Sequence, residues 1–153
     1  MKSLAAMSLV LLCFAIAAAQ SGGKIMGPPA TAKPYTPERG SAERKAIIDA
    51  LRVPVEKQLK QSVIFKVDQL RVQKGWAFFG GMPQTPDGRE IDYTGTVYQE
   101  AIDEGAFDGG VFALLRNVKG KWKVVQYVIG ATDVPYVDWD KEYGAPRAIF
   151  NMP

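Results

Sequence analysis

The spacing of the apolar residues changes from a helical to a strand-like period at Val63, and this change constrains the fold most. Before it, apolar residues recur every four positions and form one helical stripe: Ile47, Leu51, Val55 and Leu59. After it, apolar and polar residues alternate, as in a strand with one buried face. The pattern therefore predicts a helix that leads directly into a sheet.

The expected helix has a clear start and an internal interruption. Ser41 is a good N-cap, because its hydroxyl can accept a hydrogen bond from a first-turn amide. Pro54 lacks a backbone donor and crowds the carbonyl of Ala50. We therefore expect either a kinked helix or two short helices that meet near Val53, with the second ending near Gln61.

The first two expected strands form a hairpin. In the strand that begins at Val63, the apolar phase slips by one residue before Leu70, which predicts a β-bulge. A turn at Lys74-Gly75 leads into a second strand from Trp76. We expect this second strand to weaken at Gly80-Gly81 and to end directly afterwards.

A second hairpin follows a short helix. Thr96 begins a capping-box pattern, which predicts a short helix over 97–104. Strands are expected over 109–118 and 121–129, and a helical turn over 136–142. The fold class is therefore α+β, with a bent N-terminal helix packed on a curved, mostly antiparallel sheet of about four strands.

The N-terminal residues have the pattern of an exported protein. Residues 1–19 carry one positive charge, an apolar run and small residues at their end, as in a secretory signal peptide. Residues 20–40 are rich in Gly and Pro and predict a flexible arm. Residues 41–153 are expected to form one α+β domain, periplasmic or secreted, with no stable membrane insertion after cleavage.

Composition excludes several kinds of site. The only cysteine, Cys13, lies in the expected leader, and the chain has no histidine. Ser-His or Cys-His catalysis and the usual zinc sites are therefore excluded. The net charge of +3 is small and dispersed, so no nucleic-acid partner is expected. No cofactor or metal site is expected either, since the glycine pairs and the acidic residues around Gly105 lack the spacing of such sites.

One family resemblance rests on residues 75–81 (GWAFFGG) and 121–125 (KWKVV), together with a bent helix before a bulged antiparallel sheet. This arrangement resembles the nuclear-transport-factor-like superfamily, which has a cystatin-like, cone-shaped α+β architecture. The resemblance covers about residues 41–143. It implies the cone-shaped fold, but that superfamily includes enzymes, binding modules and assembly domains, so it implies no single function.

Acid–base catalysis would have to use carboxylates and tyrosines. The superfamily that the chain resembles includes isomerases and dehydratases. Some isomerase sites combine an Asp base with a Tyr donor. Asp68, near the expected bulge, is the first catalytic candidate, and Tyr93 (beside Asp92) and Tyr127 are the others. A charge at a bulge is also typical of a solvated sheet edge, and we favour that structural interpretation of Asp68.

Aromatic residues are too numerous to fill one face of one sheet. A well-filled core is the favoured interpretation, but exposed aromatics are also common at interfaces. The candidates for contact with a ligand or partner are Trp76, Phe78, Trp122, Trp139 and Tyr143.

These observations favour an exported, non-catalytic module that binds a partner protein or a small apolar ligand. A periplasmic inhibitor or immunity-type protein is one specific form of this hypothesis. The alternatives are a small isomerase or dehydratase and a passive envelope assembly domain. Dimerisation through the open sheet would suit the last of these.

Overall fold

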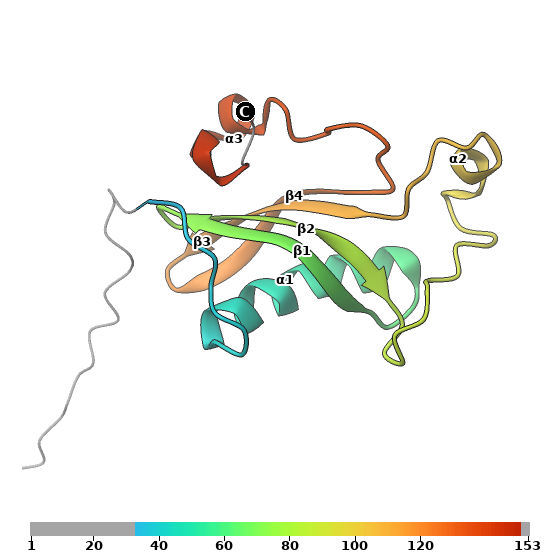
Figure 1. Cartoon of the computed structure of the whole chain (residues 1–153), viewed down its shortest axis with the longest axis horizontal. Helices are drawn as coiled ribbons and strands as arrows, with labels where there is room; N and C mark the ends of the chain where they lie inside the picture. The colour runs from blue at the N-terminus through green and yellow to red at the C-terminus, as the bar shows by residue number, and fades with distance from the viewer. Residues whose placement is uncertain (1–32, 151–153) are drawn as a thin grey trace, which may run out of the picture.

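A computed structural model describes residues 33–150 (Figure 1). The expected leader and residues 20–32 of the expected arm lie outside the described residues. In chain order, the structure contains the helix α1 (Ala42–Leu59), the strands β1 (Ile64–Gln73) and β2 (Trp76–Gln84), the helix α2 (Gln99–Asp103), the strands β3 (Val111–Val118) and β4 (Lys121–Ile129), the helix α3 (Trp139–Tyr143) and the 3-10 helix η1 (Arg147–Ile149).

Helix α1 is continuous over 18 residues, with Pro54 in its interior. The alternative of two short helices meeting near Val53 is therefore wrong. At its start, the hydroxyl of Ser41 accepts a hydrogen bond from the Arg44 amide at 3.2 Å, as its N-cap role predicts. The helix ends where Lys60 adopts a left-handed conformation, with φ of 55°. The tertiary packing of the apolar stripe keeps both halves of the helix together despite the missing amide donor.

The sheet is a four-stranded antiparallel meander in the order β1-β2-β3-β4, and it is curved and unclosed. Both hairpins turn at a Lys-Gly pair in which the two residues have positive φ: Lys74-Gly75 and Lys119-Gly120. This conformation matches the right-handed twist of the flanking strands. The expected α+β fold class is therefore confirmed.

Strand β2 is longer than the sequence indicated. It runs through Gly80-Gly81 and Met82-Pro83 to Gln84, so the expected end at these residues is wrong. The extra length is stabilised by pairing with β1, where Phe65 faces Pro83 and Ile64 faces Gln84. Glycine weakens an isolated strand, but here it allows two backbones to approach closely.

Helix α2 is shorter than expected and begins at Gln99 rather than at Val97. The side chains of the two capping-box residues, Thr96 and Gln99, make hydrogen bonds other than those of a capping box. The side chain of Gln99 accepts a hydrogen bond from the Gly95 amide, and the hydroxyl of Thr96 donates to the Tyr93 carbonyl. These bonds hold residues 94–98 in turns. Gly105 follows the helix with φ of 70°, the left-handed conformation typical of a C-terminal glycine cap.

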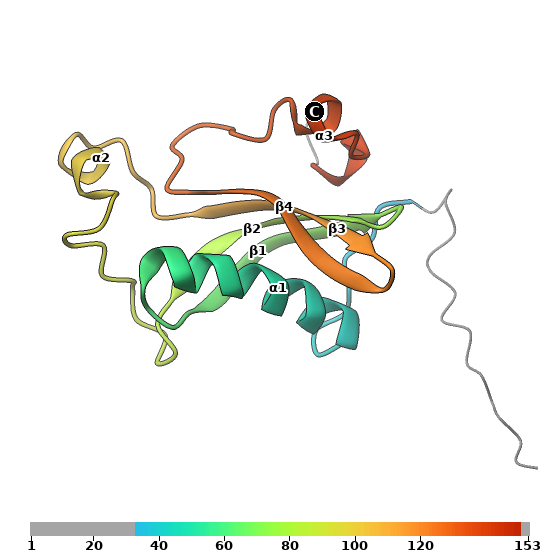
Figure 2. The ribbon, with the colours of Figure 1, turned by 180° about the vertical axis from the view of Figure 1, so that it is seen from behind.

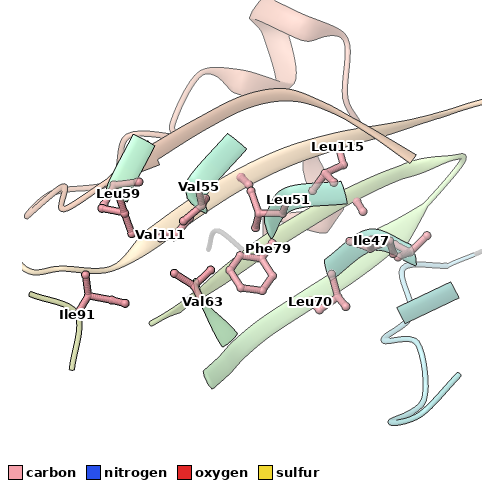
Figure 3. Close-up of a cluster of buried hydrophobic side chains, with 14 residues drawn as sticks. Ile47, Leu51, Val55, Leu59, Val63, Leu70, Phe79, Ile91, Val111 and Leu115 are labelled. Carbon is pink, nitrogen blue, oxygen red and sulfur yellow. The ribbon is translucent and has the colours of Figure 1, made fainter. Parts of the chain in front are cut away.

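Both faces of the sheet are covered (Figures 1 and 2). Helix α1 packs on one face, and Figure 3 shows its apolar stripe against side chains of β1, β2 and β3. The chain after β4 covers part of the other face. There the buried side chains of α3 and η1 pack against alternate residues of β2 and β3: Trp76, Phe78, Leu114, Trp139, Ala145, Ile149 and Phe150.

Candidate functional site

The expected bulge lies in β1. The pairing of β1 with β2 shifts register between Val67 and Gln69, which leaves Asp68 without a partner in the ladder. Val67 packs toward α1 before the bulge, and Leu70 does so after it, as the slip in apolar phase predicted. Because the bulge interrupts the alternation of the strand, the exposed side chain of Asp68 lies beside Gln69 at the sheet edge.

Asp68 lines an open recess of about 500 Å³ between β1 and the chain that precedes α1. Buried Pro37 and Leu70 form part of its lining, and exposed charged side chains lie at its rim. Five of the lining residues are charged: Glu38, Arg39, Arg44, Asp68 and Arg71. We refer to this feature as the β1 recess.

The wall opposite β1 belongs to residues 36–39, and it is fixed from both ends. Tyr35 pairs with Val72 through two main-chain hydrogen bonds of 3.0 and 2.7 Å. The hydroxyl of Tyr35 donates to the carboxylate of Glu43 in the first turn of α1. At the other end, the guanidinium of Arg44 donates to the Pro37 carbonyl at 3.2 Å. Ordered contacts of the described chain therefore begin before Ser41.

The β1 recess contains charged groups of both signs. Glu38 and Asp68 supply its carboxylates, and Arg39, Arg44 and Arg71 supply its guanidinium groups. Arg39 is exposed, whereas Arg44 is half-buried and held by its bond to the Pro37 carbonyl. The recess therefore presents charges of both signs to solvent.

The two tyrosine candidates belong to a separate cluster. The hydroxyl of Tyr127 donates to the side-chain oxygen of Gln58, and the amide nitrogen of Gln58 donates to the Tyr98 hydroxyl. The Tyr98 ring lies edge-on to that of Tyr93, with centroids 6.0 Å apart. Phe107 packs against both of these rings.

Burial keeps these tyrosines protonated. It raises the pKa of Tyr93 to about 12, with smaller contributions from Tyr98 and Asp108. Burial also raises the pKa of Tyr98 to about 12, and it raises the pKa of Tyr127 as well. A hydroxyl with a raised pKa is a weaker proton donor at neutral pH. The cluster is therefore better suited to joining α1, α2 and β4 than to proton transfer.

Asp68 and the tyrosines do not form one acid–base site. Asp68 lies on β1 and Tyr127 on β4, and these are the two edge strands of the sheet. Three strand spacings separate them, which is about 14 Å. The hydroxyl of Tyr93 is bonded to the Gly109 carbonyl at 3.1 Å, next to the start of β3.

Three of the five aromatic candidates for binding lie in the core. Trp76, Phe78 and Trp139 are buried in the cluster between the sheet and the C-terminal segment. Tyr143 is half-buried at the border of that cluster, and its ring lies edge-on to that of Trp139. Trp122 is half-buried on the opposite face, beside the core under α1. The structure therefore distributes these five residues over both faces of the sheet.

The sequence indicated Asp68 but not the arginines around it. Arg39 lies in the expected arm, and Arg44 follows the N-cap of α1. The pairing of Tyr35 with Val72 brings this part of the chain beside β1, and no local pattern reveals that contact. The available signal was the predicted bulge next to Asp68, together with two arginines that flank the helix start.

Residues 33–150 contain no group of three or more side chains arranged to hold a metal ion. None of the helices in this part of the chain is both long and apolar enough to cross a membrane.

Comparisons with known proteins give no relative from which a function could be transferred. No family model matches the chain, and the comparisons found no match among the curated proteins or the solved structures.

Proposed function

We propose that this protein is an exported, non-catalytic binding module whose ligand is another protein. The observation that carries this proposal is the filled interior of the fold. Fourteen buried side chains from α1, the sheet and the adjoining loops pack together where a ligand-binding cone would be hollow. Small-molecule sites are concave and mostly apolar, whereas the β1 recess is open and lined mainly by polar and charged residues.

The separation of the acid–base candidates favours binding over catalysis. A carboxylate-and-tyrosine enzyme needs both groups within reach of one substrate atom. Asp68 and Tyr127 are on opposite edge strands, and the tyrosines have raised pKa values. An isomerase or dehydratase mechanism therefore has no assembled pair of groups in its favour.

Export is part of the proposal, and it depends on the leader pattern of residues 1–19. Membership of the nuclear-transport-factor-like superfamily is also part of it. A helix packed on a curved antiparallel meander supports that assignment. An inhibitor or immunity-type role in the periplasm is the specific form we favour, because such proteins act by occupying a partner rather than by turnover.

Site-specific photo-crosslinking tests the proposal. A photoreactive amino acid replaces Thr36, which is exposed on the β1 recess, in the full chain expressed in the organism that carries it. The matched control places it at Val97, an exposed apolar position near α2. The segment that precedes α1 and the segment that contains α2 lie toward opposite ends of the molecule (Figures 1 and 2).

We expect a discrete adduct with one protein from position 36 and none from position 97. Adducts of equal yield from both positions, or none from position 36, would contradict the proposal. Cell fractionation with N-terminal sequencing tests export separately. It should recover a chain processed after Ala19 outside the cytoplasm, and an unprocessed cytoplasmic chain would exclude export.

A further inference from the structure

We infer that the end of the molecule formed by the two hairpin turns docks on an anionic lipid surface. Figure 1 shows both turns at one end of the molecule and α2 at the other. We refer to the turn at Lys74-Gly75, together with residues 116–123 around the second turn, as the hairpin end. None of these residues lines the β1 recess, so this surface adds a second ligand to the protein partner proposed above.

Hydrogen bonds join the two turns into one surface. The amide of Asn117 donates to the Gly75 carbonyl at 2.8 Å, and the Gly120 amide donates to the side-chain oxygen of Asn117 at 3.0 Å. Beside this link, the guanidinium of Arg116 lies over the Trp76 ring, 4.5 Å from its centroid. The two turns are therefore held in a fixed position relative to one another.

The hairpin end carries positive charge that no neighbouring carboxylate offsets. Its exposed lysines are Lys74, Lys119, Lys121 and Lys123. Within residues 33–150, none of these four lysines forms an ion pair. The stretches 69–86 and 109–132, which contain the two turns, include no Asp or Glu. Clustered lysines of this kind are attracted to a membrane that contains anionic lipids.

Two of these lysines occupy backbone positions that usually hold other residues. Lys74 and Lys119 have φ of 51° and 52°, in the left-handed region where hairpin turns favour asparagine and glycine. A lysine there strains the backbone, and such strain is common at positions that serve a function. The lysine at the tip of each hairpin therefore points to a role for its charge.

The opposite end of the molecule is acidic, which orients the protein on a negative surface. Residues 85–108 carry seven exposed carboxylates and one arginine, Arg89, which is paired with Asp87. A negative surface repels this segment and attracts the hairpin end. The two effects turn the hairpin end toward the surface and the α2 segment away from it.

The side chains of the hairpin end favour a lipid surface over a nucleic acid. Lysine attracts an anionic surface as a point charge, whereas arginine is the residue that forms paired hydrogen bonds with a phosphate. Val118 is 40% exposed and pairs with Lys121, so an apolar side chain lies among the charges, as at a membrane interface. Trp76 is buried and Trp122 is half-buried, so neither offers bases a fully exposed ring for stacking.

Cosedimentation with vesicles tests the inference. The protein is purified in the form in which its own cells produce it. It is then mixed, at about 0.1 M salt, with vesicles of equal parts phosphatidylcholine and phosphatidylglycerol or of phosphatidylcholine alone. We expect binding to the anionic vesicles that is lost at about 1 M salt, because salt screens exposed charges. Equal binding to both kinds of vesicle would overturn the inference.

Lys74→Asn combined with Lys119→Asn removes the two turn charges, and asparagine suits the left-handed conformation of both turns. Each lysine near an anionic surface strengthens binding roughly fivefold, so this double variant should bind the anionic vesicles about 25-fold more weakly. An unchanged affinity would overturn the inference, because the hairpin end would then make no contact with the lipid.

The matched control combines Lys57→Gln with Lys60→Asn at the C-terminal end of α1. It also removes two exposed positive charges, one of them from a residue with positive φ. Binding to the anionic vesicles should weaken by less than about twofold, because charges far from the contact are screened. Equal losses in the two double variants would overturn the inference, since only net charge would matter.

Other anionic partners are tested in parallel with a single-stranded oligonucleotide and a tetraglutamate peptide. Both should bind more weakly than the anionic vesicles. Tighter binding of the oligonucleotide would assign the hairpin end to a nucleic acid, and tighter binding of the peptide would assign it to an acidic protein. Either result would overturn the inference. If position 36 crosslinks a protein but the anionic vesicles bind nothing, the proposed function stands and this inference fails.

Discussion

Gly81 lies beside the bulge and pairs with Val67 of β1. A Cβ at this position would overlap the Lys66 carbonyl oxygen, and backbone cannot move aside as a flexible side chain can. At the neighbouring Gly80, a Cβ would instead make an ordinary contact of 3.4 Å with the Phe112 ring. A larger residue should therefore fit at Gly80 but not at Gly81.

We expect Gly81→Ala to lower the free energy of unfolding by about 1–3 kcal/mol, the usual cost of overpacking. Gly80→Ala should be neutral or slightly stabilising, because alanine restricts the unfolded chain more than glycine does. Denaturant unfolding of both variants measures the difference. Equal stability of the two would show that the close approach beside the bulge is absent.

The half-buried tyrosines predict a loss of stability at alkaline pH. Their pKa is 10 in the unfolded chain, and burial raises that of Tyr35 and Tyr93 to about 12 in the fold. Between these values, the folded state binds more protons than the unfolded state, so the free energy of unfolding falls as pH rises from about 10 to about 12. Below pH 10 this contribution is fully present.

Denaturant unfolding at a series of pH values, with tyrosinate absorbance as a second signal, measures this effect. In Tyr93→Phe the free energy of unfolding should fall less steeply with pH, because one tyrosine with a raised pKa is removed. Two results together would contradict the raised tyrosine pKa values. The tyrosines would titrate near pH 10 in the folded protein, and Tyr93→Phe would leave the fall of the free energy of unfolding with pH unchanged.

Helix α1 continues through a proline, which is unusual for an element of its length. Pro54 supplies no amide to the Ala50 carbonyl, and its ring crowds that carbonyl. The apolar stripe holds the helix together, with Ile47 and Leu51 before the proline and Val55 and Leu59 after it. The stability of α1 therefore depends on packing more than on its backbone hydrogen bonds.

We expect Pro54→Ala to raise the free energy of unfolding by about 1–3 kcal/mol, since the regained hydrogen bond exceeds the lost rigidity of the unfolded chain. Thermal unfolding followed by circular dichroism measures the change. A lower melting temperature for this variant would mean that the proline shapes α1 to fit the curved sheet.

Many of the helices, strands and turns were predictable from the sequence, because the patterns that indicate them are local. The four-residue period predicted α1, the phase slip predicted the bulge at Asp68, and the Lys74-Gly75 pair predicted the turn of the first hairpin. The full length of β2 was not predictable, since Met82 and Pro83 join the strand only through pairing with β1.

The candidate site was only partly predictable for the same reason. Asp68 could be singled out from its place in the pattern. Arg39 reaches the recess only because Tyr35 pairs with Val72, which is a contact between distant parts of the chain. Similarly, the burial of Trp76 and Phe78 depends on a C-terminal segment whose docking has no local signal.

The whole molecule is a sheet covered on one face by α1 and partly on the other by the C-terminal segment (Figure 1). Trp139 is the largest side chain that this segment contributes to the second core, and only 4% of it is exposed. It lies beside Tyr136, whose ring also contacts Phe78 and Phe150. The C-terminal segment is therefore part of the folded core.

We expect Trp139→Ala to lower the free energy of unfolding by about 3–5 kcal/mol, as for other buried aromatic residues. Val97→Ala should change it by less than about 0.5 kcal/mol, because Val97 is 81% exposed. Denaturant unfolding measures both. A small effect of Trp139→Ala would show that the segment is loosely held and that the second sheet face is accessible.

The central claim is that a partner binds at the β1 recess while both cores of the fold stay intact. Amide hydrogen exchange of the full chain, alone and with the partner captured at position 36, tests this most directly. We predict slower exchange confined to residues 36–44 and 64–73, and unchanged exchange over 136–150. Slower exchange centred on 136–150 or on 93–107 instead, with the recess unaffected, would contradict the account.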